Sequence, residues 1–177
     1  DERRADSEEP VRFLVERKSF LGAEKSALAE AFKLRELAER IQAYEPEQES
    51  GWLKFEESCL ASLDDPDAGI PVVFLSDHNT NGLGGNWRRR EGRDSRFHNL
   101  VLSVYASNKA EETGETLGSY GIGKMVYAVS SKIRTMAYYS TFAPSESSEE
   151  NSARLMATAF LPEHNFHDSQ YTGHAFL

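Results

Sequence analysis

The sequence has little cysteine, no long apolar run and no excess of basic charge. Its single cysteine, Cys59, cannot form an internal disulfide, which favours a reducing, cytoplasmic setting. No apolar stretch approaches the ~20 residues that a membrane-spanning helix needs, and the polar N-terminal stretch lacks the pattern of a secretory signal. The sequence therefore predicts a protein with no membrane partner.

Acidic residues outnumber basic ones, 29 to 20, giving a formal net charge of −9. An acidic chain binds nucleic acid poorly by itself, because neutralising phosphates needs a surplus of Lys and Arg. DNA stays open as the partner of a neighbouring domain. The 177 residues, with 39% hydrophobic and 28% charged, are typical of one globular domain with a buried core.

Hydrophobic periodicity predicts alternating helices and strands. Alternating apolar residues predict a strand over residues 11–20, and spacings of three and four predict one long helix from Gly22 to about Ala43. A shorter helix is predicted over 52–63, and the apolar run 70–77 predicts a buried strand. Further along we expect a loop over 78–96, a helix (or else a strand) over 97–106, a helix after Lys124, and strands over 133–143 and 153–162. This order predicts an α/β (α+β) two-layer sandwich: a mixed β-sheet with helices on one face.

The first stretch that carries chemistry is Asp77-His-Asn-Thr-Asn-Gly, directly after the strand 70–77. A carboxylate at a strand end sits on rigid support and can accept a hydrogen bond from an exocyclic amine such as that of adenine. Asn79, Asn81 and Gly82 tolerate positive φ, so the backbone can turn sharply and approach a ligand closely. The alternative is a plain turn, stabilised by the aspartate, that only ends the strand.

The second stretch places three glycines ahead of an apolar helix. Such spacing frees backbone N–H groups, and the helix adds its own unpaired N–H groups, so together they suit phosphate. The alternative is a flexible linker before a surface helix. The candidate residues are Gly118, Ser119, Tyr120, Gly121, Ile122, Gly123 and Lys124. This stretch also satisfies G-x-x-x-x-G-K, but the following Met125 cannot hold Mg²⁺ as the P-loop Ser or Thr does, and no strand precedes it. We therefore reject a P-loop NTPase and keep it only as a minor alternative.

Together the two stretches resemble the GHKL superfamily, which includes gyrase, the large heat-shock chaperones, histidine kinases and MutL. Asp77 is similar to the adenine-reading aspartate of its D-x-G-x-G box. Gly118, Gly121 and Gly123 are similar to its G-x-x-G-x-G box, where a mobile lid meets a helix. Ser107-Asn-Lys109 resembles a lid element of MORC-type ATPases and their bacterial relatives near restriction and defence systems. The resemblance covers residues 70–141.

The resemblance implies a Bergerat-type ATP-binding fold that takes ATP and Mg²⁺. It implies ATP contacts at the residues of both boxes and at Lys109. It also implies a mobile lid within 86–117, homodimerisation when nucleotide binds, and partner proteins in DNA repair, restriction or phage defence. Residues 1–177 would form a single ATP-binding domain.

The sequence departs from the family pattern in two ways. Asn79 and Asn81 stand where glycines are usual. No Glu-x-x-x-Asn for the catalytic base and Mg²⁺ occurs in residues 1–76, since Glu30 is followed four residues later by Leu34. We therefore expect the catalytic glutamate upstream of Asp1, and a transducer domain downstream. The alternative is a degenerate, non-catalytic relative that serves as a scaffold or interaction domain.

The remaining candidates have simpler interpretations. An arginine cluster in the 78–96 loop is predicted to be mostly solvated, although one arginine in a lid could reach phosphate. The histidines near the C-terminal end lack helical i, i+4 spacing, so we predict no metal site. Cys59 and nearby apolar residues are predicted to be core. The arginines are Arg88, Arg89, Arg90, Arg93 and Arg96; the histidines are His164, His167 and His174; the apolar residues are Trp52, Phe55 and Leu60.

Overall fold

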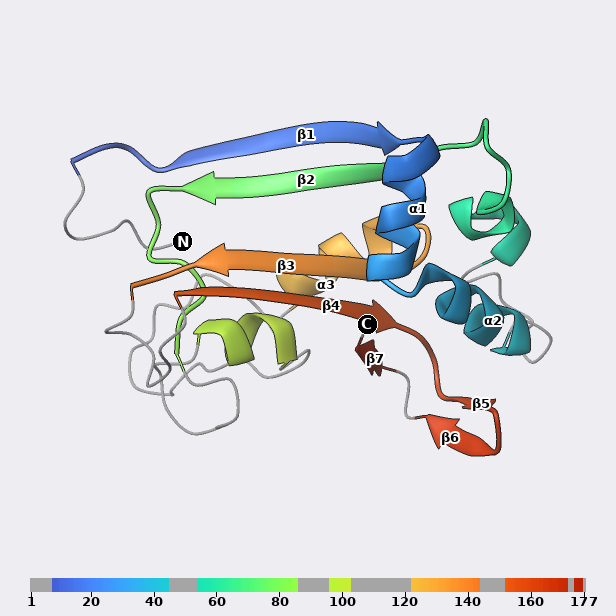
Figure 1. The fold of residues 1–177 in the computed structure, drawn as a ribbon. Helices are drawn as coiled ribbons and strands as arrows, with labels where there is room; N and C mark the ends of the chain where they lie inside the picture. Colours follow the sequence, from blue (N-terminus) through green and yellow to red (C-terminus); the bar gives the residue numbers. More distant parts are fainter. Residues whose placement is uncertain are drawn as a thin grey trace. The chain divides into compact units, whose positions relative to one another are not determined.

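The computed structural model describes residues 8–44, 54–85, 96–102, 122–143, 152–171 and 174–176. Helices and small β-sheets occur together in these ranges, which establishes an α+β class (Figure 1). The strands are β1 (Arg12–Phe20), β2 (Ile70–His78), β3 (Thr135–Thr141), β4 (Ala153–Phe160), β5 (His164–Phe166), β6 (Ser169–Tyr171) and β7 (His174–Phe176). The helices are α1 (Gly22–Ala31), α2 (Leu34–Tyr44) and α3 (Ile122–Ser130), with short helical turns η2 (Phe55–Glu57), η3 (Cys59–Ser62) and η4 (His98–Leu102).

Hydrogen bonding places the strands of the described ranges in three small sheets. β1 pairs with β2, β4 lies between β3 and β7, and β5 pairs with β6. The β4–β7 pair is antiparallel with Thr158 opposite Phe176, and the β5–β6 pair is antiparallel with Asn165 opposite Gln170. The strands predicted over 11–20, 70–77, 133–143 and 153–162 are thus confirmed to within a few residues.

The chain divides into two compact units. Unit 1 contains residues 1–12, 77–129 and 137–156, and unit 2 contains residues 13–76, 130–136 and 157–177. Both boxes named above fall in unit 1. Unit 2 contains α1, α2 and most of β1 and β2. No helix in the described ranges is long and apolar enough to cross a membrane.

The prediction for residues 70–77 is right about the strand and wrong about its burial. Ile70 at the start of β2 is buried, but Val73 is 59% exposed and Phe74 is 42% exposed. β2 pairs with β1 in a two-stranded sheet, and Leu75 of β2 is also exposed. An apolar run predicts extended structure, but it cannot distinguish a covered strand from an accessible one.

The single helix predicted from Gly22 to about Ala43 is also wrong, because the structure has two. Lys33, between α1 and α2, has φ +47°, a left-handed conformation that ends a right-handed helix. The amide of Phe32 closes the last turn of α1 by donating to the carbonyl of Leu28. Apolar spacing of three and four continues across the break, so the pattern alone did not reveal it.

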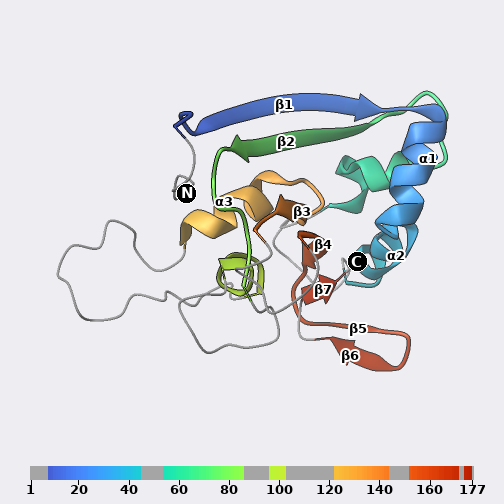
Figure 2. The same cartoon turned by 60° about the vertical axis from the view of Figure 1, so that its left-hand side comes forward.

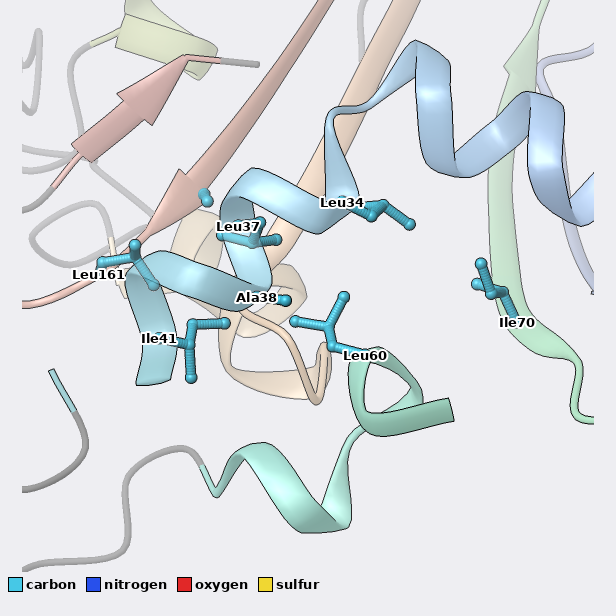
Figure 3. Packing of buried hydrophobic residues seen from close by; sticks show 8 residues of the cluster. Leu34, Leu37, Ala38, Ile41, Leu60, Ile70 and Leu161 are labelled. Atoms are coloured by element: carbon cyan, nitrogen blue, oxygen red, sulfur yellow. The ribbon is translucent and has the colours of Figure 1, made fainter. Parts of the chain in front are cut away.

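α2 supplies much of the apolar core of unit 2. Leu37 and Ile41, one turn apart on the same helix face, have no exposed surface. Figure 3 shows Ala38 and Ile41 meeting Leu60 of η3. Burying each large aliphatic side chain contributes ~1.5–3 kcal/mol, so this face fixes α2 in the unit. The full cluster is Leu34, Leu37, Ala38, Ile41, Leu60, Ile70, Ala159 and Leu161.

The segment before β2 forms two 3₁₀ turns, where an α-helix was predicted over 52–63. The Ser58 hydroxyl accepts the Leu60 N–H at 3.2 Å and caps η3, which interrupts helix continuation. Phe55 and Cys59 pack against the core as expected, and burial raises the pKa of the Cys59 thiol. Trp52 lies outside the described residues.

A buried lysine ties α1 to the turn before β2. The Lys25 side chain is 4% exposed, and its ammonium donates to the carbonyls of Ser62, Asp65 and Ala68 at 2.7, 2.7 and 2.9 Å. Within this turn the Asp65 carboxylate accepts the Asp67 N–H. Lys25 thus adds a charged donor to three carbonyls of this turn, two of which, those of Ser62 and Asp65, also accept a backbone N–H.

An arginine fastens the β5–β6 hairpin to α2. The Arg40 guanidinium lies 4.8 Å from the centre of the Phe166 ring and 4.2 Å from that of Tyr171, and it donates to Glu36 at 2.8 Å. The hairpin is visible at the lower right of Figure 2. Cation–π contacts of this kind stabilise by ~0.5–2 kcal/mol. His164 and His167 therefore belong to a packed hairpin and its turn.

Candidate functional site

The candidate site begins where β2 ends. Asp77 is the next-to-last residue of the strand and its side chain is exposed. The chain then leaves the strand in a loop, residues 79–85, which we call the aspartate loop. This loop lies in unit 1 with the end of β3 and the start of β4. The predicted placement of a carboxylate at the end of a strand, ahead of a loop, is confirmed.

Positive φ angles turn the aspartate loop. Asn79 has φ +63° and Gly82 has φ +69°, which confirms that Asn takes the left-handed geometry where glycine is usual. Asn81 does not adopt this geometry. The Asn79 side-chain amide donates to the Pro10 carbonyl at 2.8 Å and to Glu9 at 3.2 Å. Its side chain thus fastens the residues before β1.

Gly82 presses the loop against the end of β3. A Cβ built on Gly82 would collide with the carbonyl oxygen of Thr141 and lie 3.0 Å from the hydroxyl of Ser140. Only glycine fits a backbone approach this close, and only glycine takes the positive φ without strain. The sequence predicted that Gly82 allows a positive φ. The structure shows in addition that β3 leaves no room for a side chain at this position.

Both polar backbone groups of Leu83 are held by side chains from distant strands. The Leu83 N–H donates to the Ser140 hydroxyl of β3 at 2.8 Å, and its carbonyl accepts from Arg154 of β4 at 3.5 Å. We call Ser140 and Arg154 the Leu83 clamp. The Arg154 guanidinium also lies 5.4 Å from the Phe97 ring centre and 4.7 Å from that of Phe142.

A backbone hydrogen bond joins the aspartate loop to the helical segment further along the chain. The Phe97 N–H donates to the Gly84 carbonyl at 3.3 Å, and the Phe97 side chain is 2% exposed. η4 begins one residue later, as a π-type helix, so the helix alternative for residues 97–106 holds over the described part. Arg96 is already helical, which corrects the prediction of a loop through residue 96. Packing of Phe97 explains the early start.

The glycine box is only partly within the described residues. Lys109, Gly118, Ser119, Tyr120 and Gly121 lie outside them, as do Arg88, Arg89, Arg90 and Arg93. Ile122, Gly123 and Lys124 form the first turn of α3, although they were predicted to be loop. The first turn of a helix has unpaired N–H groups, so helical geometry at these positions still presents donors to an anion.

β3 has both candidate segments beside it. The aspartate loop hydrogen-bonds to β3 through the Ser140 hydroxyl, and α3 lies beside β3 in both views (Figures 1 and 2). Tyr138 and Ser140 are two residues apart on the strand, so they share a face, and both are half-buried between exposed neighbours. Burial, with a smaller contribution from the Tyr127 phenol of α3, raises the pKa of Tyr138 to about 12.

The raised pKa of Tyr138 predicts how stability responds to alkali. Its pKa is about 12 in the folded chain against 10.0 unperturbed. The stability that the neutral Tyr138 phenol contributes is therefore fully present below pH 10 and is lost as pH rises through 12. We expect Tyr138→Phe to lose less stability than the parent between pH 10 and pH 12, measured by urea unfolding at each pH. Tyr139→Phe, at a 69% exposed position, is the control and should match the parent.

Sequence reasoning missed the residues that hold the site. Ser140 and Arg154 lie on strands whose sequences predicted extended structure and nothing more. No spacing motif marks them, because their partners are 57 and 71 residues away in the chain. Among the described residues, no three His, Cys, Asp or Glu side chains form a group that could hold a metal ion.

Comparison of the chain with protein-family models, with curated proteins and with solved structures found no match.

Proposed function

We propose that this chain is the ATP-binding domain of a GHKL-type ATPase, with a Bergerat-type two-layer sandwich fold. One observation carries the proposal. The loop after Asp77 hydrogen-bonds to β3 through Ser140, and the helix after the glycine box, α3, lies beside the same strand (Figures 1 and 2). An adenine-reading carboxylate and a phosphate-binding helix must lie near one another to hold a single nucleotide, and their place beside a common strand supports that.

In this proposal each segment has a separate task. Asp77 accepts a hydrogen bond from the exocyclic amine of adenine, and the aspartate loop borders the base. The glycine box and the N-terminal turn of α3 donate backbone N–H groups to the phosphates. Lys109 and Lys124 add positive charge near them. The anionic phosphates are thus matched by local donors even though the chain is acidic overall.

The described residues do not provide the catalytic machinery. They offer no group of three ligand side chains for Mg²⁺, so we assign none of them to the metal. By resemblance, the glutamate base and the Mg²⁺-binding Asn would come from upstream of Asp1. In the full-length protein we propose that ATP hydrolysis drives lid closure and dimerisation, serving DNA repair, restriction or phage defence.

A non-catalytic scaffold is the second candidate. Two observations favour it: Glu-x-x-x-Asn is missing from residues 1–76, and Asn replaces glycine at positions 79 and 81. The Asn79 side chain is engaged with Pro10, which is a structural task. A scaffold would keep the fold of the aspartate loop without binding nucleotide.

Calorimetric titration with ATP and Mg²⁺ tests the proposal. We expect the parent chain to bind and Asp77→Asn to bind at least ~10-fold more weakly, because a hydrogen bond to a charged group contributes ~1.5–3 kcal/mol. Asp67→Asn makes the same charge change at an exposed turn in unit 2 and should bind like the parent.

Two results would count against the proposal. Equal affinity in the parent and Asp77→Asn would remove the adenine-reading role. Failure of the parent to bind, repeated in a chain extended upstream of Asp1, would leave the scaffold as the better account.

A further inference from the structure

We infer that Ser140 is a positioning residue for nucleotide binding: through its hydroxyl it holds the aspartate loop in the conformation that receives the base. This inference rests on the proposed function. Ser140 itself lies on β3 and is assigned no contact with nucleotide. It acts through the backbone of Leu83.

Leu83 and its neighbours in the aspartate loop make several attachments to other parts of the chain. The Leu83 N–H and carbonyl are both bound by side chains, from Ser140 and Arg154. The neighbours are also held, since Gly82 abuts Thr141 and the Gly84 carbonyl accepts from Phe97. Gly82 lies against β3, Leu83 is bonded to β3 and β4, and Gly84 is bonded to Phe97, so this part of the loop has little freedom to move.

The Ser140 hydroxyl both accepts and donates a hydrogen bond. It accepts the Leu83 N–H at 2.8 Å and donates to the Thr141 carbonyl at 3.4 Å. Thr141 is the residue whose carbonyl meets Gly82. The hydroxyl thus links the two points at which the loop touches β3. Without it, the Leu83 N–H loses a side-chain acceptor that nothing else in the described contacts replaces.

Ser131 offers a matched control for the Ser140→Ala variant. The Ser131 hydroxyl accepts the backbone N–H of Thr135 at 3.1 Å, which is the same kind of bond, in a turn of unit 2. Ser131→Ala therefore removes an equivalent hydrogen bond without touching the aspartate loop. A purely structural loss predicts equal behaviour of the two alanine variants.

The experiment combines ATP titration with hydrogen exchange of the free chain. We expect Ser140→Ala to bind ATP about three- to tenfold more weakly, the loss that one net hydrogen bond predicts. The Leu83 amide should exchange faster in this variant. Ser131→Ala should leave both unchanged, and Ser140→Thr, which keeps the hydroxyl, should restore both.

The outcomes separate this inference from the proposed function. If the parent binds ATP and the two alanine variants bind equally well, the positioning role is overturned and the proposed function stands. If Leu83 exchange is the same in Ser140→Ala and the parent, the positioning role is also overturned. If the parent does not bind ATP even when extended upstream, both are overturned.

Discussion

Gly82→Ala is expected to destabilise unit 1 by ~3 kcal/mol or more. Two costs add: a side chain at positive φ costs ~1–3 kcal/mol, and forcing a Cβ into packed surroundings costs about the same. Gly82 has φ +69°, and its added Cβ would collide with the carbonyl of Thr141, which as strand backbone cannot rotate aside. Chemical unfolding followed by circular dichroism measures the loss.

Gly22→Ala separates the two costs. Gly22 has φ +51°, but a Cβ built there meets nothing within 4 Å. Only the conformational cost remains, so we expect ~1–2 kcal/mol. Equal losses in the two variants would mean that the loop does not press against β3 and that the Leu83 clamp is not formed as described.

Lys25→Met is expected to destabilise unit 2 by ~3 kcal/mol or more. Methionine fills a similar volume but has no N–H, so the carbonyls of Ser62, Asp65 and Ala68 lose the ammonium donor, although those of Ser62 and Asp65 keep one backbone N–H each. A hydrogen bond to a charged group contributes ~1.5–3 kcal/mol, and three such bonds are lost. β2 begins two residues after Ala68, so we expect the loss to spread to that strand. Thermal unfolding of the parent and the variant tests this.

Lys18→Met is the matched control. Lys18 pairs with Glu24 at 3.0 Å, but its side chain is 49% exposed. Surface pairs of this kind contribute ~0–1 kcal/mol. If Lys18→Met and Lys25→Met lose similar stability, the three hydrogen bonds of Lys25 are not formed in solution.

Periodicity was enough to locate most elements of this chain. The strands β1, β2, β3 and β4 were each predicted, because alternating or continuous apolar residues persist over their whole length. It failed where one residue decides the backbone. Lys33 breaks a helix whose apolar spacing is uninterrupted, and Ser58 interrupts a helix-like segment with a cap. Such single-residue events leave the average pattern unchanged.

The candidate site likewise contains some residues that were predictable from the sequence and some that were not. Asp77 and the turn at Asn79 were predictable, since both follow from local sequence at a strand end. Ser140 and Arg154 were not, because their importance comes from what the fold brings next to them.

The distance along the chain between the aspartate loop and its attachments affects how the protein is made. During synthesis Leu83 emerges long before Ser140, 57 residues later, and Arg154, 71 residues later. Translation adds ~5–20 residues per second, so several seconds pass between the synthesis of the loop and that of Ser140 and Arg154. A nascent chain halted before Arg154 has the whole aspartate loop but an incomplete Leu83 clamp. The order of synthesis thus makes this loop one of the last parts of unit 1 to take its final conformation.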